Sequence, residues 1–204
     1  MLEKEDFISA AKIINCDYRI IMAVYEVEAA GRGYLDDGRV KILFEGHRFW
    51  KRLQRSGFDP AAFIKSYPEY RNVLYKNWDK KKYKGGASEW NRMSEAIEVC
   101  KMLNADVDIA LKSASYGSFQ IMGENCEMCG YHSAQEMISD YNLNGEEAQL
   151  NSFVRFVKSK KLDDELVAKN FSKFAEGYNG TAYRENKYDT KLKSAYDKIV
   201  KSLP

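Results

Sequence analysis

Apolar residues recur at intervals of three and four positions along most of the chain, which predicts a succession of amphipathic helices. The first two are predicted over residues 4–15 and 17–30, with Asp17 as the N-cap of the second helix. The same spacing predicts further helices over 47–55, 88–104, 145–160 and 189–201, with Asn144 as the cap of the third. Capping residues predict the starts of four more helices, at Asp59-Pro60, at Asp106, at the Ser133/Glu136 capping box and at Asn170, the last ending near Gly180.

One segment breaks the helical pattern. Asp37-Gly38 stands between two apolar runs, which is a strong signal for the turn of a β-hairpin. If these two residues form the turn, Asp36 pairs with Arg39 and Glu45 lies opposite position 30. No other segment reads convincingly as β-structure. The pattern therefore predicts a mainly α fold, a single helical domain with one small β-hairpin.

Composition restricts the classes of function. Apolar residues make up 45% of the chain and charged residues 30%, as in ordinary globular proteins. The 32 basic and 30 acidic residues give a net charge of +2, too balanced for a dedicated nucleic-acid binder, so no nucleic-acid partner is expected. No apolar run approaches the roughly 20 residues that span a bilayer, so no membrane insertion is expected either. We expect a monomer.

The acidic N-terminus does not resemble a signal peptide. We therefore expect synthesis in the cytoplasm, so that any target in the cell wall is reached only after release by another factor.

Cysteine spacing gives the prediction on metals. Cys126 and Cys129 form a CxxC pair with His132 nearby. A structural zinc site needs four ligands, and no second pair completes this one. We predict reduced, partly buried cysteines, no metal and no cofactor.

The lysine-rich stretch within residues 71–87 is predicted to be an exposed loop, although its charge could also attract an anionic polymer. The chain has 14 Tyr, 10 Phe and 3 Trp. Most of these rings are predicted to lie in the core, but some could stack on sugar faces.

Two carboxylates stand out by position. Glu28 falls near the C-terminal end of the second helix, where the helix dipole disfavours an anion and raises the pKa, as a general acid requires. In the predicted hairpin register, Glu45 lies about 6–10 Å from Glu28, which overlaps the carboxyl separation of inverting glycosidases. The alternative is that both are exposed carboxylates without a catalytic role. Glu26 faces another side of the helix, where a solvated salt bridge suits it better.

Several uninterrupted blocks of this sequence resemble the N-acetylmuramidase domain of phage endolysins. The family pattern reads approximately VxEVESxGxGFLxDGRPxILFERHxF. Its counterparts here are Val24–Leu35 (VYEVEAAGRGYL), Asp37-Gly38-Arg39 and Ile42–Phe49 (ILFEGHRF), and the resemblance continues through Glu89-Trp90, 113–123, Gln149-Leu150, Phe153, Tyr178-Asn179-Gly180 and 188–192. It covers about residues 7–200, and we expect one N-acetylmuramidase domain over 1–204.

The resemblance implies a lysozyme-like fold that hydrolyses the glycan strands of bacterial peptidoglycan. Glu28 matches the catalytic acid of the family, and Glu45 matches the Glu of the ILFE block. The resemblance and the polar or aromatic character of the side chains predict substrate-binding roles for Tyr34, His47, Tyr116, Ser118, Gln120, Tyr178 and Asn179. Alternatives are that Gln120 bridges backbone groups and that His47 merely orients Glu45 or caps the next helix. Ala29, Gly46 and Tyr116 depart from the family pattern.

These observations lead to a muramidase as the predicted function. It would cleave the β-1,4 bond between N-acetylmuramic acid and N-acetylglucosamine, with Glu28 as acid and Glu45 as base or electrostatic partner. Three alternatives remain open: a lytic transglycosylase that uses Glu28 alone, a hydrolase with chitinase-like specificity, and a non-catalytic module that binds wall glycan.

Overall fold

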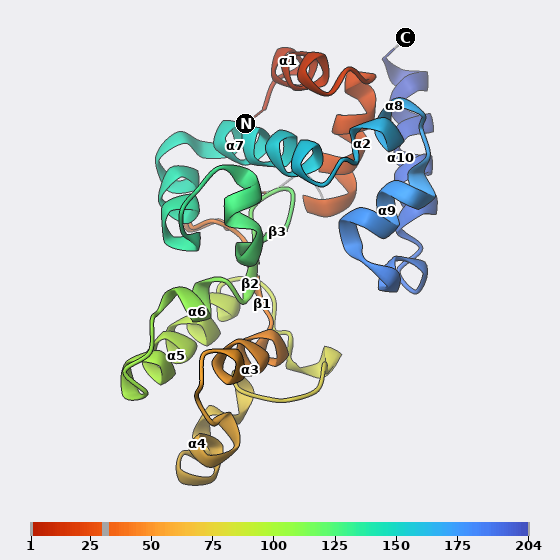
Figure 1. Ribbon diagram of the computed structural model, residues 1–204. Helices are drawn as coiled ribbons and strands as arrows, with labels where there is room; N and C mark the ends of the chain where they lie inside the picture. Colours follow the sequence, from red (N-terminus) through yellow and green to blue (C-terminus); the bar gives the residue numbers. More distant parts are fainter. Residues whose placement is uncertain (1, 30–32, 204) are drawn as a thin grey trace.

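A computed structural model describes residues 2–29 and 33–203, with the side chains of 29, 181 and 182 left out. Two groups of helices lie above and below a small sheet (Figure 1). The upper group is α1 (Lys4–Ile14), α2 (Tyr18–Ala29), α7 (Ala134–Ser159), α8 (Asp163–Val167), α9 (Phe171–Asn179) and α10 (Tyr188–Ser202). The lower group is α3 (Gly46–Arg55), α4 (Pro60–Ser66), α5 (Ser88–Met102) and α6 (Asp108–Leu111). The sheet is β1 (Ile42–Phe44), β2 (Ala114–Tyr116) and β3 (Ile121–Met122), and the 3-10 helices are η1 (Pro68–Asn72), η2 (Lys80–Lys82), η3 (Gly123–Cys129) and η4 (Thr181–Arg184).

The predicted helix starts are confirmed by the hydrogen bonds of their caps. Carboxylate, hydroxyl or amide oxygens accept from backbone N–H groups of the first turn, and each such cap contributes about 1 kcal/mol. The capping residues are Asp17, Asp59, Ser133 and Asn170. Asp106 accepts from the Asp108 N–H, but the N-cap of α6 is Val107, so the predicted cap lies one residue too early. The mainly helical fold therefore follows from signals that each lie within a few residues of the helix they start.

The predicted hairpin forms around Asp37-Gly38, but its register differs by one residue from the prediction, and β1 pairs with a different segment. Leu35 N–H donates to the Arg39 carbonyl, and Tyr34 bridges to Val40, so the turn holds three residues instead of two. Gly38, at φ +81°, supplies the left-handed conformation that this longer turn needs.

Strand β1 pairs with the distant β2, and β2 with β3, to form a three-stranded antiparallel sheet in the described part of the chain. The Glu45 N–H donates to the Ser113 carbonyl. Position 30, its predicted partner, lies outside the described residues.

The predicted boundary between two helices at Asn144 is confirmed, because α7 consists of two helical stretches that meet at a kink at Gly145. α7 continues through Gly145, whose φ of +69° and ψ of −151° interrupt the helical geometry. The Asn144 side chain donates to Asp140 at 2.6 Å, so the predicted cap is wrong. The kink is possible because glycine adopts positive φ without the steric cost of a Cβ.

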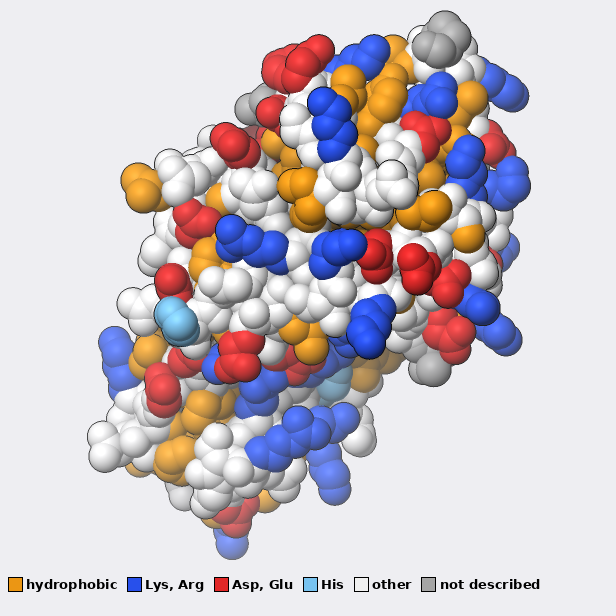
Figure 2. Space-filling view, turned by 45° about the horizontal axis from the view of Figure 1, so that its top comes forward, with side chains coloured by type: hydrophobic (Ala, Val, Ile, Leu, Met, Phe, Trp, Pro, Cys, Tyr) orange, Lys and Arg blue, Asp and Glu red, His pale blue; other side chains and the backbone are white. Residues whose placement is uncertain are grey.

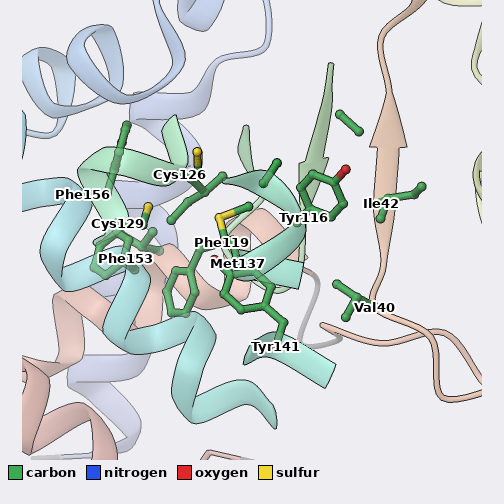
Figure 3. Packing of buried hydrophobic residues seen from close by; sticks show 14 of the residues in the cluster. Val40, Ile42, Tyr116, Phe119, Cys126, Cys129, Met137, Tyr141, Phe153 and Phe156 are labelled. Atoms are coloured by element: carbon green, nitrogen blue, oxygen red, sulfur yellow. The ribbon is translucent and has the colours of Figure 1, made fainter. Parts of the chain in front are cut away.

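Aromatic rings fill the centre of the upper group. Phe119 stacks on Phe153 at 4.6 Å between ring centroids, and Tyr178 packs against Phe174 at 5.2 Å. Figure 3 shows Phe119 and Phe153 beside Met137, Tyr141 and the buried thiols of Cys126 and Cys129. The predicted core role of most aromatic residues is therefore confirmed.

Charged side chains of both signs are interspersed over the face in Figure 2, as the small net charge implies. The predicted lysine-rich loop over 71–87 begins at the end of η1 and contains η2, and Val73 and Leu74 are its buried residues. Among the described residues, no helix combines the length and apolarity needed to cross a bilayer.

Candidate active site

A cleft of about 430 Å³ lies where the end of α2, the sheet, η3 and the end of α9 meet. Its walls are largely polar, although they include a few apolar side chains. The lining residues are Glu28, Leu43, Glu45, Arg48, Ser115, Gln120, Ile121, Met122, Asn125, Phe156, Tyr178, Asn179 and Asn186. The fold thus brings both predicted catalytic carboxylates into one cleft, from segments on either side of the turn at Gly38.

A second hollow of about 240 Å³ continues from the cleft. The two share Glu28, Asn179 and Asn186, and the second extends to Tyr183 and Lys191. Glu28 therefore lies at the junction of two adjoining hollows. An acid in this position can reach a bond inside a bound polymer, with chain on both sides of it.

The Glu28 carboxyl has a strongly perturbed pKa. Burial raises it from 4.5 to about 7, against the lowering effects of the Tyr188 hydroxyl, the Asn179 amide and the charge of Lys41. The Asn179 amide nitrogen lies 3.5 Å from a Glu28 carboxylate oxygen. The direction agrees with the sequence prediction, but the main cause is burial and not the helix dipole. At neutral pH this carboxyl holds a proton about half of the time, as a general acid should.

Glu45 lies in a different electrostatic setting, directly after β1. The Arg48 guanidinium donates to its carboxylate at 2.9 Å, and the same guanidinium contacts Glu124 at 2.6 Å. Arg52 also pairs with Glu124. Burial raises the pKa of Glu45, and Arg48 opposes this effect by stabilising the anion.

His47 lies behind Glu45, with its Nε2 3.3 Å from the Glu45 carboxylate. Burial and the charges of Arg48 and Lys51 lower the pKa of His47 to about 4, so the imidazole is neutral at pH 7. Its ring faces that of Tyr75 at 6.5 Å. This arrangement fits the interpretation in which His47 orients Glu45.

Three more predicted site residues line the cleft, but they bond mainly to the protein. The Tyr178 hydroxyl donates to the Phe119 carbonyl at 2.7 Å, which fixes the end of α9 and so places Asn179 beside Glu28. Gln120 accepts from the Ser115 hydroxyl at 2.9 Å and donates to the Gly117 carbonyl at 2.8 Å. The Gln120 amide therefore bridges groups within the turn, as the alternative interpretation states.

Tyr34, Tyr116 and Ser118 are not among the described residues that line the cleft. Tyr116 is 1% exposed and donates to the Leu111 carbonyl, while the Tyr34 hydroxyl donates to the Tyr141 carbonyl at 2.5 Å. Ser118 is fully buried. Successive side chains of strand β2 face opposite sides, so Ser115 reaches the cleft whereas Tyr116 faces the core. In the turn that follows β2, Ser118 is buried and Gln120 lines the cleft. The structure thus places these three side chains outside the cleft lining, and their contact with substrate stays a prediction.

Sequence reasoning missed several residues of the two hollows. Arg48 could have been found, since it follows Glu45 by one helical turn. Asn125, Asn186 and Tyr188 carry no local signal, because only the tertiary fold brings their segments to Glu28 or to the sheet. Glu26, in contrast, pairs with Lys198 at 3.3 Å on the surface, as predicted for a solvated salt bridge.

Comparisons with known proteins agree with this geometry. The N-acetylmuramidase family model matches residues 17–200. The crystal structure of Burkholderia AP3 phage endolysin superposes with a TM-score of 0.81 and 35% sequence identity, covering 98% of this chain and 72% of that one. No curated protein matches the sequence. The family match spans most of the chain, and the chain belongs to the N-acetylmuramidase family.

Proposed function

We propose that Glu28 is the general acid and Glu45 the general base with which this peptidoglycan hydrolase of endolysin type cleaves its substrate. The bond cleaved is the β-1,4 linkage between N-acetylmuramic acid and N-acetylglucosamine. The observation that carries the proposal is the contrast between two carboxylates in one cleft. Burial raises the pKa of both carboxyls, that of Glu28 to about 7, but only Glu45 is paired with Arg48, which stabilises its anion. Carboxylates with such different environments divide naturally into acid and base.

In the proposed reaction, Glu28 protonates the glycosidic oxygen as the bond to the anomeric carbon breaks. Glu45 takes a proton from a water molecule that attacks this carbon from the opposite face, which inverts its configuration. A cleft of about 430 Å³ has room for this water beside a sugar, since a water molecule occupies only about 30 Å³.

The remaining cleft side chains suit a neutral polyhydroxylated substrate. Asn125, Asn179 and Asn186 offer amide donors and acceptors for hydroxyl and acetamide groups. Phe156 and Met122 supply apolar surface for a sugar face. The adjoining hollow next to Glu28 leaves space for further residues of a glycan strand.

We further propose that one copy of the chain acts alone, because Glu28 and Glu45, the two groups that the proposed reaction needs, line the same cleft. In this proposal, the protein is made in the cytoplasm and reaches the wall after release by another factor. Light scattering at micromolar concentration tests the first point, since a mass near 23.5 kDa is expected.

A lytic transglycosylase is the second candidate, and one observation favours it. Arg48 compensates the charge of Glu45, which weakens Glu45 as a base. A transglycosylase needs only Glu28, since a hydroxyl of the muramic acid itself closes the ring.

Fragment release from purified peptidoglycan by variants separates these candidates. We expect reducing-end muramic acid from the native protein and a loss of release of at least about 100-fold in both Glu28→Gln and Glu45→Gln. Glu26→Gln is the matched control, because Glu26 lies on the same helix and is exposed. If Glu45→Gln keeps full activity and the released fragments end in anhydro-muramic acid, the protein is a lytic transglycosylase. No fragments from the native protein would leave only a glycan-binding module.

A further inference from the structure

A buried ion pair whose members do not line the cleft lies beside strand β1, which ends directly before Glu45. Glu89 and Arg92 stand one turn apart on α5, with a nitrogen–oxygen distance of 2.7 Å and side chains that are 0% and 5% exposed. Burying two charges is costly, and apolar residues of similar size often fill such sites equally well. The pair therefore requires an explanation beyond stability.

Both members bind the backbone of Phe44, the residue directly before Glu45. The Phe44 N–H donates to the Glu89 carboxylate at 3.0 Å, and Arg92 donates to the Phe44 carbonyl at 2.9 Å. Strand β1 is an edge strand of the described sheet, and on its other side it pairs with β2. The ion pair thus takes the place of a further strand along the free edge of β1.

The same pair also reaches the residues that follow Glu45. Arg92 donates to the Tyr75 hydroxyl at 3.1 Å. The Tyr75 ring packs so closely on Gly46 that a Cβ there would overlap it, and it faces the ring of His47. The ion pair therefore fixes the backbone on both sides of Glu45. It bonds directly to Phe44, and it contacts Gly46 and His47 through Tyr75.

Glu89 has a second function in this arrangement. Its other carboxylate oxygen accepts from the N–H groups of Lys84 at 2.7 Å and Gly85 at 3.0 Å. These bonds attach the end of the lysine-rich loop to the same point. Arg92 also donates to the Asn72 carbonyl at 3.3 Å, so five backbone groups from three segments converge on one buried ion pair.

We propose that Glu89 and Arg92 are positioning residues for Glu45. They fix the end of β1 so that the Glu45 carboxylate keeps its place relative to Glu28 and the attacking water. This inference rests on the proposed catalytic role of Glu45. Displacement of a catalytic group by about 1 Å can lower a rate by about 100-fold, so the pair acts on kcat more than on KM.

Glu89→Gln tests the proposal at one atom. The amide can keep an oxygen toward Lys84 and Gly85, but it then presents an NH₂ group to the Phe44 N–H and to Arg92. We expect kcat to fall about 10- to 100-fold with KM within about twofold, at a temperature where the variant is folded. Arg92→Lys is the milder companion variant, since it keeps the charge and loses the forked donor.

The control is a variant that destabilises the fold without touching this region. Ile14→Ala opens a cavity in the core beside α1, which packs on α2 and α7. If the role of Glu89 is purely structural, Glu89→Gln and Ile14→Ala should have equal kcat when each is assayed the same number of degrees below its own melting temperature. That result would overturn the proposal.

A double-mutant cycle with Glu45→Asp, which keeps a carboxylate, completes the test. If Glu89 acts through Glu45, Glu89→Gln lowers kcat by a smaller factor in the Glu45→Asp variant than in the native protein. Independent, multiplicative losses would contradict this. If Glu45→Gln has native kcat, the proposed role of Glu45 fails and this inference with it. If Glu45→Gln is impaired but Glu89→Gln is not, only this inference fails.

Discussion

Replacement of Glu28 by glutamine is predicted to abolish activity and also to stabilise the protein at alkaline pH. The proton of the partly buried Glu28 carboxyl is held in the folded state up to a pH of about 7, whereas in the unfolded chain it is lost near 4.5. The folded state therefore binds more protons between these values, and the free energy of unfolding falls as the pH rises through this window. Glutamine has no proton to lose and avoids this penalty.

The size of the effect follows from the same two values. The difference between 4.5 and about 7 corresponds to about 3 kcal/mol at about 1.4 kcal/mol per pKa unit. The carboxyl is partly exposed, and solvent screening reduces the energy that is realised. We expect Glu28→Gln to raise the free energy of unfolding by about 1–3 kcal/mol at pH 8 and to leave it nearly unchanged at pH 4.

Urea unfolding of both proteins at pH 4 and pH 8 is the assay. Titration of Glu45 occurs in both proteins and cancels in the difference between them. Glu26→Gln, an exposed position on the same helix, is the control for replacing a glutamate by glutamine on α2. An equal effect of Glu28→Gln at both pH values would refute the reasoning, because it would mean that Glu28 titrates normally in the folded state.

Three further changes test the surroundings of the carboxylates. Asn179→Ala removes a contact that lowers the pKa of Glu28, so the alkaline limb of the kcat profile should move to higher pH; an unmoved limb would speak against this contact. Arg48→Gln removes the charge that lowers the pKa of Glu45, so the acid limb should also move to higher pH, and a profile identical to the native one would rule out Glu45 as the base. Gly33→Ala would push a methyl group into buried side chains, and urea unfolding should show a loss of about 1–3 kcal/mol; native stability would argue against this packing.

The helices could be predicted because their signals are local. Asp59-Pro60 places a cap and a first-turn proline side by side, and α4 begins there in the structure. Glu28 could be identified in the same way, from its place near the end of a helix. The prediction of its raised pKa was right in direction, but the dominant cause, burial, depends on α9 and α10, which come from the other end of the chain.

The sheet could not be predicted, because its pairing is not local. β1 joins β2 across about 70 residues of sequence, and each strand has only three residues. A two-residue turn at Asp37-Gly38 was the best local solution, but the chain forms a longer turn and uses β1 for another partner. Glu89 and Arg92 gave no signal of their own either, since acidic and basic residues one turn apart are usually exposed.

The central claim is hydrolysis at muramic acid by a general acid and an activated water. Digestion of purified peptidoglycan in H₂¹⁸O, followed by mass spectrometry of the first fragments, tests it most directly. The account predicts reducing-end N-acetylmuramic acid that carries one ¹⁸O atom from the attacking water. Anhydro-muramic ends without ¹⁸O, or label at reducing-end N-acetylglucosamine, would contradict it.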